Sequence, residues 1–179
     1  MKGVAPAFSA TDFRGGRISP AAYRGRNLLL SFYRFASCPF CNLRIHELIQ
    51  RMPDLGRQDL SRVAVFHAPR DGILKYVGKQ QPPFPILPDP EYRIYRQYGV
   101  ESALRGFLAG SALRMGRALK SIGMGFLPGL MDGHKTLVPA DFLIGPDGTI
   151  HTACYGRDIA DLLRILESPT SATPQRRAG

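Results

Sequence analysis

The chain of 179 residues is 44% hydrophobic and 21% charged, which fits one soluble globular domain with a sizeable core. Three cysteines are too few for the disulfide framework of a small secreted protein. The net charge of +10 comes from basic residues scattered from Arg14 to Arg177 without a basic and aromatic run, so we expect no nucleic-acid partner.

The N-terminal segment predicts a small hairpin. Met1 to Gly16 lacks the apolar core of a signal peptide, so we expect a cytoplasmic protein, in a compartment that keeps thiols reduced. Ala5 to Ile18 is typical of an opening strand and hairpin, with its turn at Gly15-Gly16. Ser19 is placed to cap a short helical turn that begins at Pro20.

The apolar run Asn27 to Tyr33 predicts a central strand covered on both faces, and Cys38-Pro39-Phe40-Cys41 follows it at the start of a helix. Helical spacing extends from Pro39 to Arg51, and Pro53 is expected to end the helix. A helix N-terminus stabilises a thiolate because its amide N–H groups are unpaired and carry a partial positive charge. Pro39 suits the first turn because it has no N–H to leave unpaired.

Two thiols one helical turn apart predict redox chemistry. Cys38 is the candidate nucleophile, and Cys41 is the candidate resolving thiol that closes a Cys38–Cys41 disulfide. The alternatives are an inert buried thiol and a metal site, although the metal would need two further ligands. Arg34, four residues before Cys38, is placed to hold the thiolate or a peroxide oxygen, or else is a solvated residue at the strand end. Structural roles are expected for His46, His67 and Cys154.

The remaining segments alternate between strands and helices, which predicts an α/β sandwich with a mixed sheet. Strands are expected at Ser61 to Phe66, Phe84 to Leu87, Val138 to Ile144 and Thr149 to Cys154. Helices are expected at Asp71 to Val77, Glu91 to Tyr98 and Ile159 to Leu166, followed by a flexible C-terminal tail over residues 168–179.

Leu104 to Ile122 stands outside this alternation, within an expected helical insertion at about residues 101–135. Its apolar positions follow helical spacing, so the simplest interpretation is a helix docked on the sheet. A homodimer contact and a lid over the thiols are the alternatives. The run Ile122 to Met131 is broken by Gly and Pro and is too short to span a membrane, so we expect no stable membrane association.

The order of these segments resembles the peroxiredoxin-like branch of the thioredoxin fold, the alkyl hydroperoxide reductase and thiol-specific antioxidant family. The resemblance is carried by Ala5 to Ser19, Tyr23 to Tyr33, the Cys-x-x-Cys run, Asp89 to Val100 and Pro139 to Ile150. It implies a thioredoxin-like three-layer sandwich with a mixed central sheet and an N-terminal hairpin extension. A single domain would then cover residues 1–167.

The resemblance also implies that Pro139 is the cis-proline that faces the redox pair in thioredoxin-like folds. Three positions depart from typical members of the family. Ser31 replaces a Pro, and Phe35 replaces the Thr or Ser that orients the peroxide. Ala140-Asp141 stands where an Arg that activates peroxide is often found.

The implied function is that of a thiol-dependent antioxidant enzyme. The Cys38 thiolate would attack a hydroperoxide, Cys41 would resolve the product, and a thioredoxin-type or glutathione-type reductant would restore both thiols. No bound cofactor or metal is expected. One alternative, favoured by Phe35, is a thiol–disulfide oxidoreductase that acts on protein disulfides. The other is a non-enzymatic redox sensor.

Overall fold

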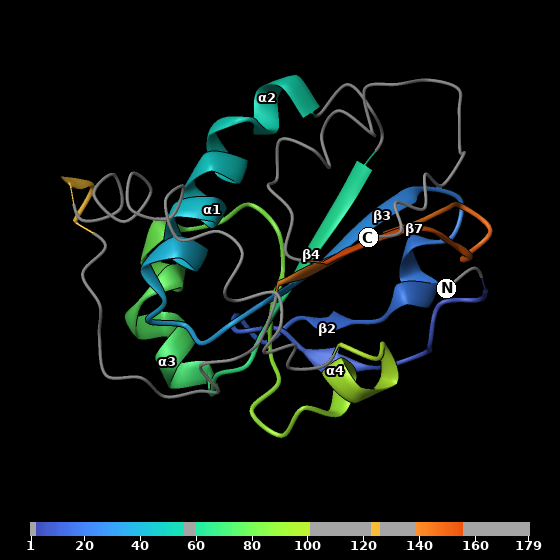
Figure 1. Ribbon diagram of the computed structural model, residues 1–179, viewed down its shortest axis with the longest axis horizontal. Helices are drawn as coiled ribbons and strands as arrows, with labels where there is room; N and C mark the ends of the chain where they lie inside the picture. Colours follow the sequence, from blue (N-terminus) through green and yellow to red (C-terminus); the bar gives the residue numbers. More distant parts are fainter. Residues whose placement is uncertain (1–2, 56–59, 101–122, 126–138, 156–179) are drawn as a thin grey trace, which may run out of the picture.

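The computed structural model describes residues 3–55, 60–100, 123–125 and 139–155 (Figure 1). Its centre is a five-stranded sheet with the strand order β5-β4-β3-β6-β7. The strands are β3 (Asn27–Tyr33), β4 (Leu60–Phe66), β5 (Ile86–Pro88), β6 (Ala140–Ile144) and β7 (Ile150–Tyr155). β3, β4 and β5 are parallel, whereas β6 is antiparallel to β3 and β7 is antiparallel to β6. The predicted mixed sheet is therefore confirmed.

The predicted N-terminal hairpin is also confirmed. β1 (Ala10–Thr11) and β2 (Arg17–Ile18) form a two-stranded antiparallel sheet. Gly15 has a φ of 98°, a conformation that favours glycine at the turn. The hairpin leads into the 3-10 helix η1 (Pro20–Tyr23), and the Ser19 side chain accepts a hydrogen bond from the Ala21 amide as the predicted cap.

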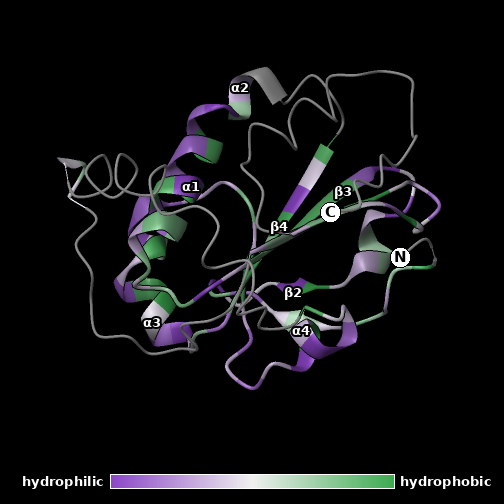
Figure 2. Cartoon of the chain, viewed as in Figure 1, coloured by the Kyte–Doolittle hydropathy of each residue, from purple (hydrophilic) through white to green (hydrophobic). Residues whose placement is uncertain are grey.

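Helices cover both faces of the central sheet. One face packs against α1 (Pro39–Gln50), α3 (Arg70–Lys75) and the 3-10 helix η3 (Val77–Gln80). The other face packs against α4 (Arg93–Gln97) and the N-terminal hairpin. Figure 1 shows α1 and α4 on opposite sides of the strands, and Figure 2 shows hydrophobic residues concentrated along β3. β3 is mostly apolar, with Ser31 as the polar residue in its interior, because both of its faces are buried.

The bounds of three predicted helices differ from the structure, and the one expected at Glu91 to Tyr98 is the shorter α4 (Arg93–Gln97). α1 ends at Gln50, and Pro53 lies inside a separate short helix, α2 (Met52–Leu55). A proline fits there because the amide groups of the first helical turn have no intrahelical partner. The helix predicted over Asp71 to Val77 is divided into α3 and η3.

Several sequence-based predictions lie outside the described residues. These are the helices at 104–122 and 159–166, the insertion at about 101–135 and the tail at 168–179, so the single domain over 1–167 stays a prediction. In the part of the chain that is described, no helix is long and apolar enough to cross a membrane.

A buried ion pair fixes α1 on the sheet. Arg44 of α1 donates from Nη2 to Oδ2 of Asp141 in β6, at 2.5 Å. Ser31 of β3 stands opposite Asp141 in the strand register, and its Oγ donates to Asp141 Oδ1 at 2.7 Å. The Arg44 guanidinium also lies 5.5 Å from the centre of the Tyr33 ring, within cation–π range. One helix and two strands thus meet at a single carboxylate.

Asp141→Ala is expected to lower the free energy of unfolding by about 3–5 kcal/mol, because it leaves the Arg44 charge buried without its partner. The double variant Asp141→Ala, Arg44→Met removes both charges and should recover much of this loss. Urea-induced unfolding measures the difference. The matched control is Glu91→Ala, because the Glu91–Arg93 pair has the same 2.5 Å separation but is exposed, and it should change stability by less than about 1 kcal/mol.

Candidate active site

The two thiols lie where β3 passes into α1. Cys38 is the residue before the helix, with an extended backbone (φ −66°, ψ 116°), and Pro39 is the first helical residue, as predicted. Cys41 lies in the first turn of the helix. Both cysteines are free thiols, and they expose only 1% and 3% of their surfaces. The Cys38 amide donates to the Phe35 carbonyl at 3.1 Å, which closes the loop between the strand and the helix.

Several groups around Cys38 favour its thiolate. The largest contribution is a hydrogen bond from the Cys41 thiol, which together with the amides of Cys41 and Phe40 and the charge of Arg34 lowers the pKa of Cys38 to about 7. Desolvation acts in the opposite direction but is outweighed. Cys38 is therefore ionised to a substantial degree at neutral pH, which is the state a nucleophile requires.

Cys41 has the opposite character. Burial raises the pKa of its thiol well above the ordinary value, and its hydrogen bond to Cys38 raises it further. A thiol that donates a hydrogen bond to a thiolate keeps its own proton to a higher pH, because two neighbouring negative charges repel each other. The electrostatics thus favour the thiolate on Cys38 and the neutral thiol on Cys41, while the predicted role of Cys38 as nucleophile stays a prediction.

The charge of Arg34 acts to lower the pKa of Cys38 and partly offsets the rise in the pKa of Cys41. Its predicted role of holding the thiolate or a peroxide oxygen stays a prediction. Pro139 directly precedes β6, whose first residue, Ala140, pairs with Phe32 near the end of β3. The predicted cis bond joins Pro139 to Val138, which lies outside the described residues, so that conformation stays a prediction.

The other candidates have structural contacts. His67 stacks on Tyr92 with ring centres 3.9 Å apart, and its Nε2 lies 3.1 Å from the Pro90 carbonyl. Cys154 is buried in β7 beside Leu29 and Leu60, as expected for a core residue. Within the described ranges, no group of three or more His, Cys, Asp or Glu residues is arranged to hold a metal ion.

The structure also explains the positions that depart from the family pattern. Ser31 and Asp141 are bonded to each other beneath α1, so these two departures form one structural feature. Phe35 is 6% exposed and packs in the same apolar cluster as both thiols. The hydroxyl that orients a peroxide in typical members is therefore replaced here by a buried ring.

Sequence analysis missed the polar residues that support the site. Asn42, directly after Cys41, donates from its side-chain nitrogen to the Ala36 carbonyl at 2.7 Å and to the Cys38 carbonyl at 2.9 Å. Gln80 of η3 donates to Asn42, and Arg44 binds Asp141. A polar residue inside an apolar helical face, as at Asn42 and Arg44, was the available signal.

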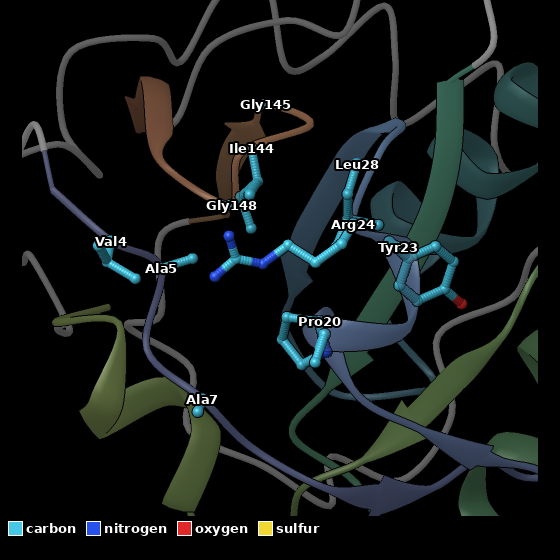
Figure 3. Close-up of a pocket in the computed structure, with 11 residues that line it drawn as sticks. Val4, Ala5, Ala7, Pro20, Tyr23, Arg24, Leu28, Ile144, Gly145 and Gly148 are labelled. Atoms are coloured by element: carbon cyan, nitrogen blue, oxygen red, sulfur yellow. The ribbon is translucent and has the colours of Figure 1, made fainter.

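A small pocket of about 110 Å³ lies away from the thiols. Figure 3 shows Arg24 extending across it toward Gly148, between Leu28 and Ala5. Leu28 is near the start of β3, whereas Cys38 follows its end, so the pocket is at the opposite end of the strand from the redox pair. It is not part of the candidate active site.

Comparison with known proteins agrees with the family resemblance seen in the sequence. Residues 1–153 match the model of the AhpC/TSA family. A Mycobacterium tuberculosis protein provisionally named a peroxiredoxin is 30% identical over 95 residues, which are 53% of this chain and 60% of that protein. The matched part therefore spans less than two thirds of that relative's length.

Solved structures confirm the predicted thioredoxin-like sandwich. The crystal structure of Peroxidoxin BcpB from Mycobacterium tuberculosis has a TM-score of 0.69 and 17% identity, and the match covers 95% of this chain and 97% of that one. A solution structure from Neisseria meningitidis, provisionally named a thioredoxin, has a TM-score of 0.61 and 22% identity, with 91% and 87% covered.

The ultraviolet absorbance of the thiolate should titrate with a midpoint at about pH 7 in the reduced protein, because the pKa of Cys38 is lowered to that value. Cys41→Ala removes the hydrogen bond that contributes most, so the midpoint should rise toward the ordinary cysteine pKa. Cys41→Ser retains a donor and should raise it less. Cys154→Ser is the matched control and should leave the midpoint unchanged; an unchanged midpoint in Cys41→Ala would contradict the assignment.

Proposed function

The chain belongs to the AhpC/TSA family, and we propose on this basis that it is a thiol peroxidase, an oxidoreductase that reduces hydroperoxides through Cys38. The observation that carries the proposal is the asymmetric pair of thiols. The pKa of Cys38 is lowered to about 7 by the Cys41 thiol, while burial keeps Cys41 protonated. Cys38 is the sulfur that attacks, and Cys41 stays protonated beside it until the second step.

In the first step the Cys38 thiolate attacks the terminal oxygen of the hydroperoxide. The O–O bond breaks, the alcohol or water leaves after taking up a proton, and Cys38 becomes a sulfenic acid. Arg34 contributes positive charge close to both sulfurs, which favours the thiolate and the negative charge that develops on the leaving oxygen.

In the second step Cys41 attacks the Cys38 sulfur. The Cys38–Cys41 disulfide forms and one water is released, with the proton of Cys41 ending on the departing oxygen. Cys41 is three residues further along α1, so this step is intramolecular. A dithiol protein of the thioredoxin type, or glutathione, would then reduce the disulfide. Because these donors operate where thiols are kept reduced, we propose a cytoplasmic location as well.

A second candidate function is thiol–disulfide exchange with protein disulfides. Phe35 favours it, because the hydroxyl that orients a peroxide in typical family members is replaced by a buried ring. The burial of Cys38 favours the peroxidase, since the thiol of a residue that is 1% exposed is reached more easily by a small hydroperoxide than by a disulfide on a protein surface.

Reduced protein mixed with hydrogen peroxide or an alkyl hydroperoxide should lose peroxide rapidly and form the Cys38–Cys41 disulfide. Cys38→Ser is expected to abolish the reaction, because no lowered-pKa thiol remains. Cys41→Ser should retain the first step and accumulate sulfenic acid, which a dimedone-type reagent detects by mass spectrometry.

Cys154→Ser is the control for this experiment, because Cys154 lies in the β7 core and has no part in either step. Insulin reduction measured on the same proteins separates the two candidate functions. Peroxide consumption no faster than that of a free thiol, together with rapid insulin reduction, would replace the peroxidase with the disulfide oxidoreductase.

A further inference from the structure

The side-chain amides of Asn42, which is buried, and Gln80, which is half-buried, connect the active-site turn to η3. Asn42 is 5% exposed, and both protons of its side-chain nitrogen are used: one bond goes to the Ala36 carbonyl at 2.7 Å and the other to the Cys38 carbonyl at 2.9 Å. The Cys38 carbonyl also accepts the backbone amide of Asn42 at 3.0 Å. The loop before the helix is thereby attached to the first turn of α1.

Gln80 of η3 completes this arrangement, which we call the amide clasp. Its side-chain nitrogen donates to the Asn42 backbone carbonyl at 3.1 Å and to Asn42 Oδ1 at 3.2 Å. Neither amide can be reversed, because reversal would place an oxygen against two acceptors. Gln80 lies 38 residues from Asn42, so the clasp connects the active-site turn to a separate element of the fold.

We propose that the amide clasp is a positioning device that holds Cys38 and Cys41 ready for disulfide closure, and so limits overoxidation of Cys38. The second part rests on the proposed peroxidase function. Asn42 and Gln80 touch neither a substrate nor a reacting sulfur in this role. They act through the backbone of Cys38.

Two reactions compete for the Cys38 sulfenic acid. In closure, Cys38–SOH and Cys41–SH give the disulfide and one water. In overoxidation, Cys38–SOH and a second hydroperoxide give Cys38–SO₂H and the corresponding alcohol or water. Closure is intramolecular, so its rate depends on how often the two sulfurs are aligned, whereas overoxidation depends on peroxide concentration.

The clasp can persist through closure. The Cys41 thiol already donates a hydrogen bond to the Cys38 sulfur across the start of α1, so rotation of the two side chains is the movement that closure requires. The bonds of Asn42 are made to backbone carbonyls and are not disturbed by that rotation. A clasp present before and after closure lowers the entropy lost when the ring forms.

Gln80→Ala and Asn42→Leu test this proposal. In equilibrium with reduced and oxidised glutathione, each variant is expected to form the Cys38–Cys41 disulfide with an equilibrium constant lowered about three- to tenfold, because closure must then order roughly one residue of backbone that the clasp had already ordered. Under repeated turnover with peroxide, each should also accumulate more Cys38 sulfinic acid per turnover, measured by mass spectrometry.

Gln50→Ala, an exposed glutamine at the end of the same helix, is the matched control and should change neither quantity. A purely structural role would lower the thermal unfolding midpoint and leave the glutathione equilibrium unchanged, and that result would overturn the proposal. If Asn42→Leu does not fold, the half-buried Gln80→Ala decides the outcome alone.

The two readouts separate this proposal from the proposed function. The glutathione equilibrium needs no peroxide, so a lowered equilibrium constant in a protein without peroxidase activity would support the clasp and contradict the peroxidase. An active peroxidase whose variants keep the equilibrium constant and the sulfinic acid yield of the parent would contradict the clasp.

Discussion

The position of α1 depends on the buried contact between Arg44 and Asp141. A helix packed only by apolar side chains can slide or rotate by small amounts, but a 2.5 Å ion pair shielded from water has a narrow range of geometries. This contact lies one helical turn beyond Cys41. It therefore sets the place at which the N-terminal amides of the helix, and with them the charge that favours the Cys38 thiolate, meet the end of β3.

The two thiols of the site are three residues apart in the chain and differ in how easily they ionise. An amide-rich helix start and a neighbouring thiol stabilise charge on Cys38, while burial opposes charge on Cys41. The side-chain amide of Asn42 beside the pair donates to backbone carbonyls rather than to the sulfurs. Asn42 thus helps to fix the geometry, while the Cys41 thiol, the helix amides and Arg34 lower the pKa of Cys38.

The features predicted from sequence were those with a local signal. An apolar run predicted β3, turn residues predicted the hairpin, and the Cys-x-x-Cys spacing predicted the two thiols at the helix start. The supporting contacts have no local signal, because Arg44 and Asp141 are 97 residues apart and Asn42 and Gln80 are 38 apart. The position of Asn42 and Arg44 on an apolar helical face hints at their burial, but their partners could be learned only from the tertiary packing.

The link between Ser31, Asp141 and Arg44 constrains how this site could arise from, or return to, the more typical pattern of the family. Asp141 is 3% exposed at its side chain, so introducing it before its partner would bury an isolated carboxylate. Arg44 is 13% exposed and has a long side chain that can extend toward water. The order of substitutions that destabilises the protein less is therefore arginine at position 44 first and aspartate at position 141 second. The two positions are expected to show strong epistasis and to covary among homologues, although they belong to distant parts of the sequence.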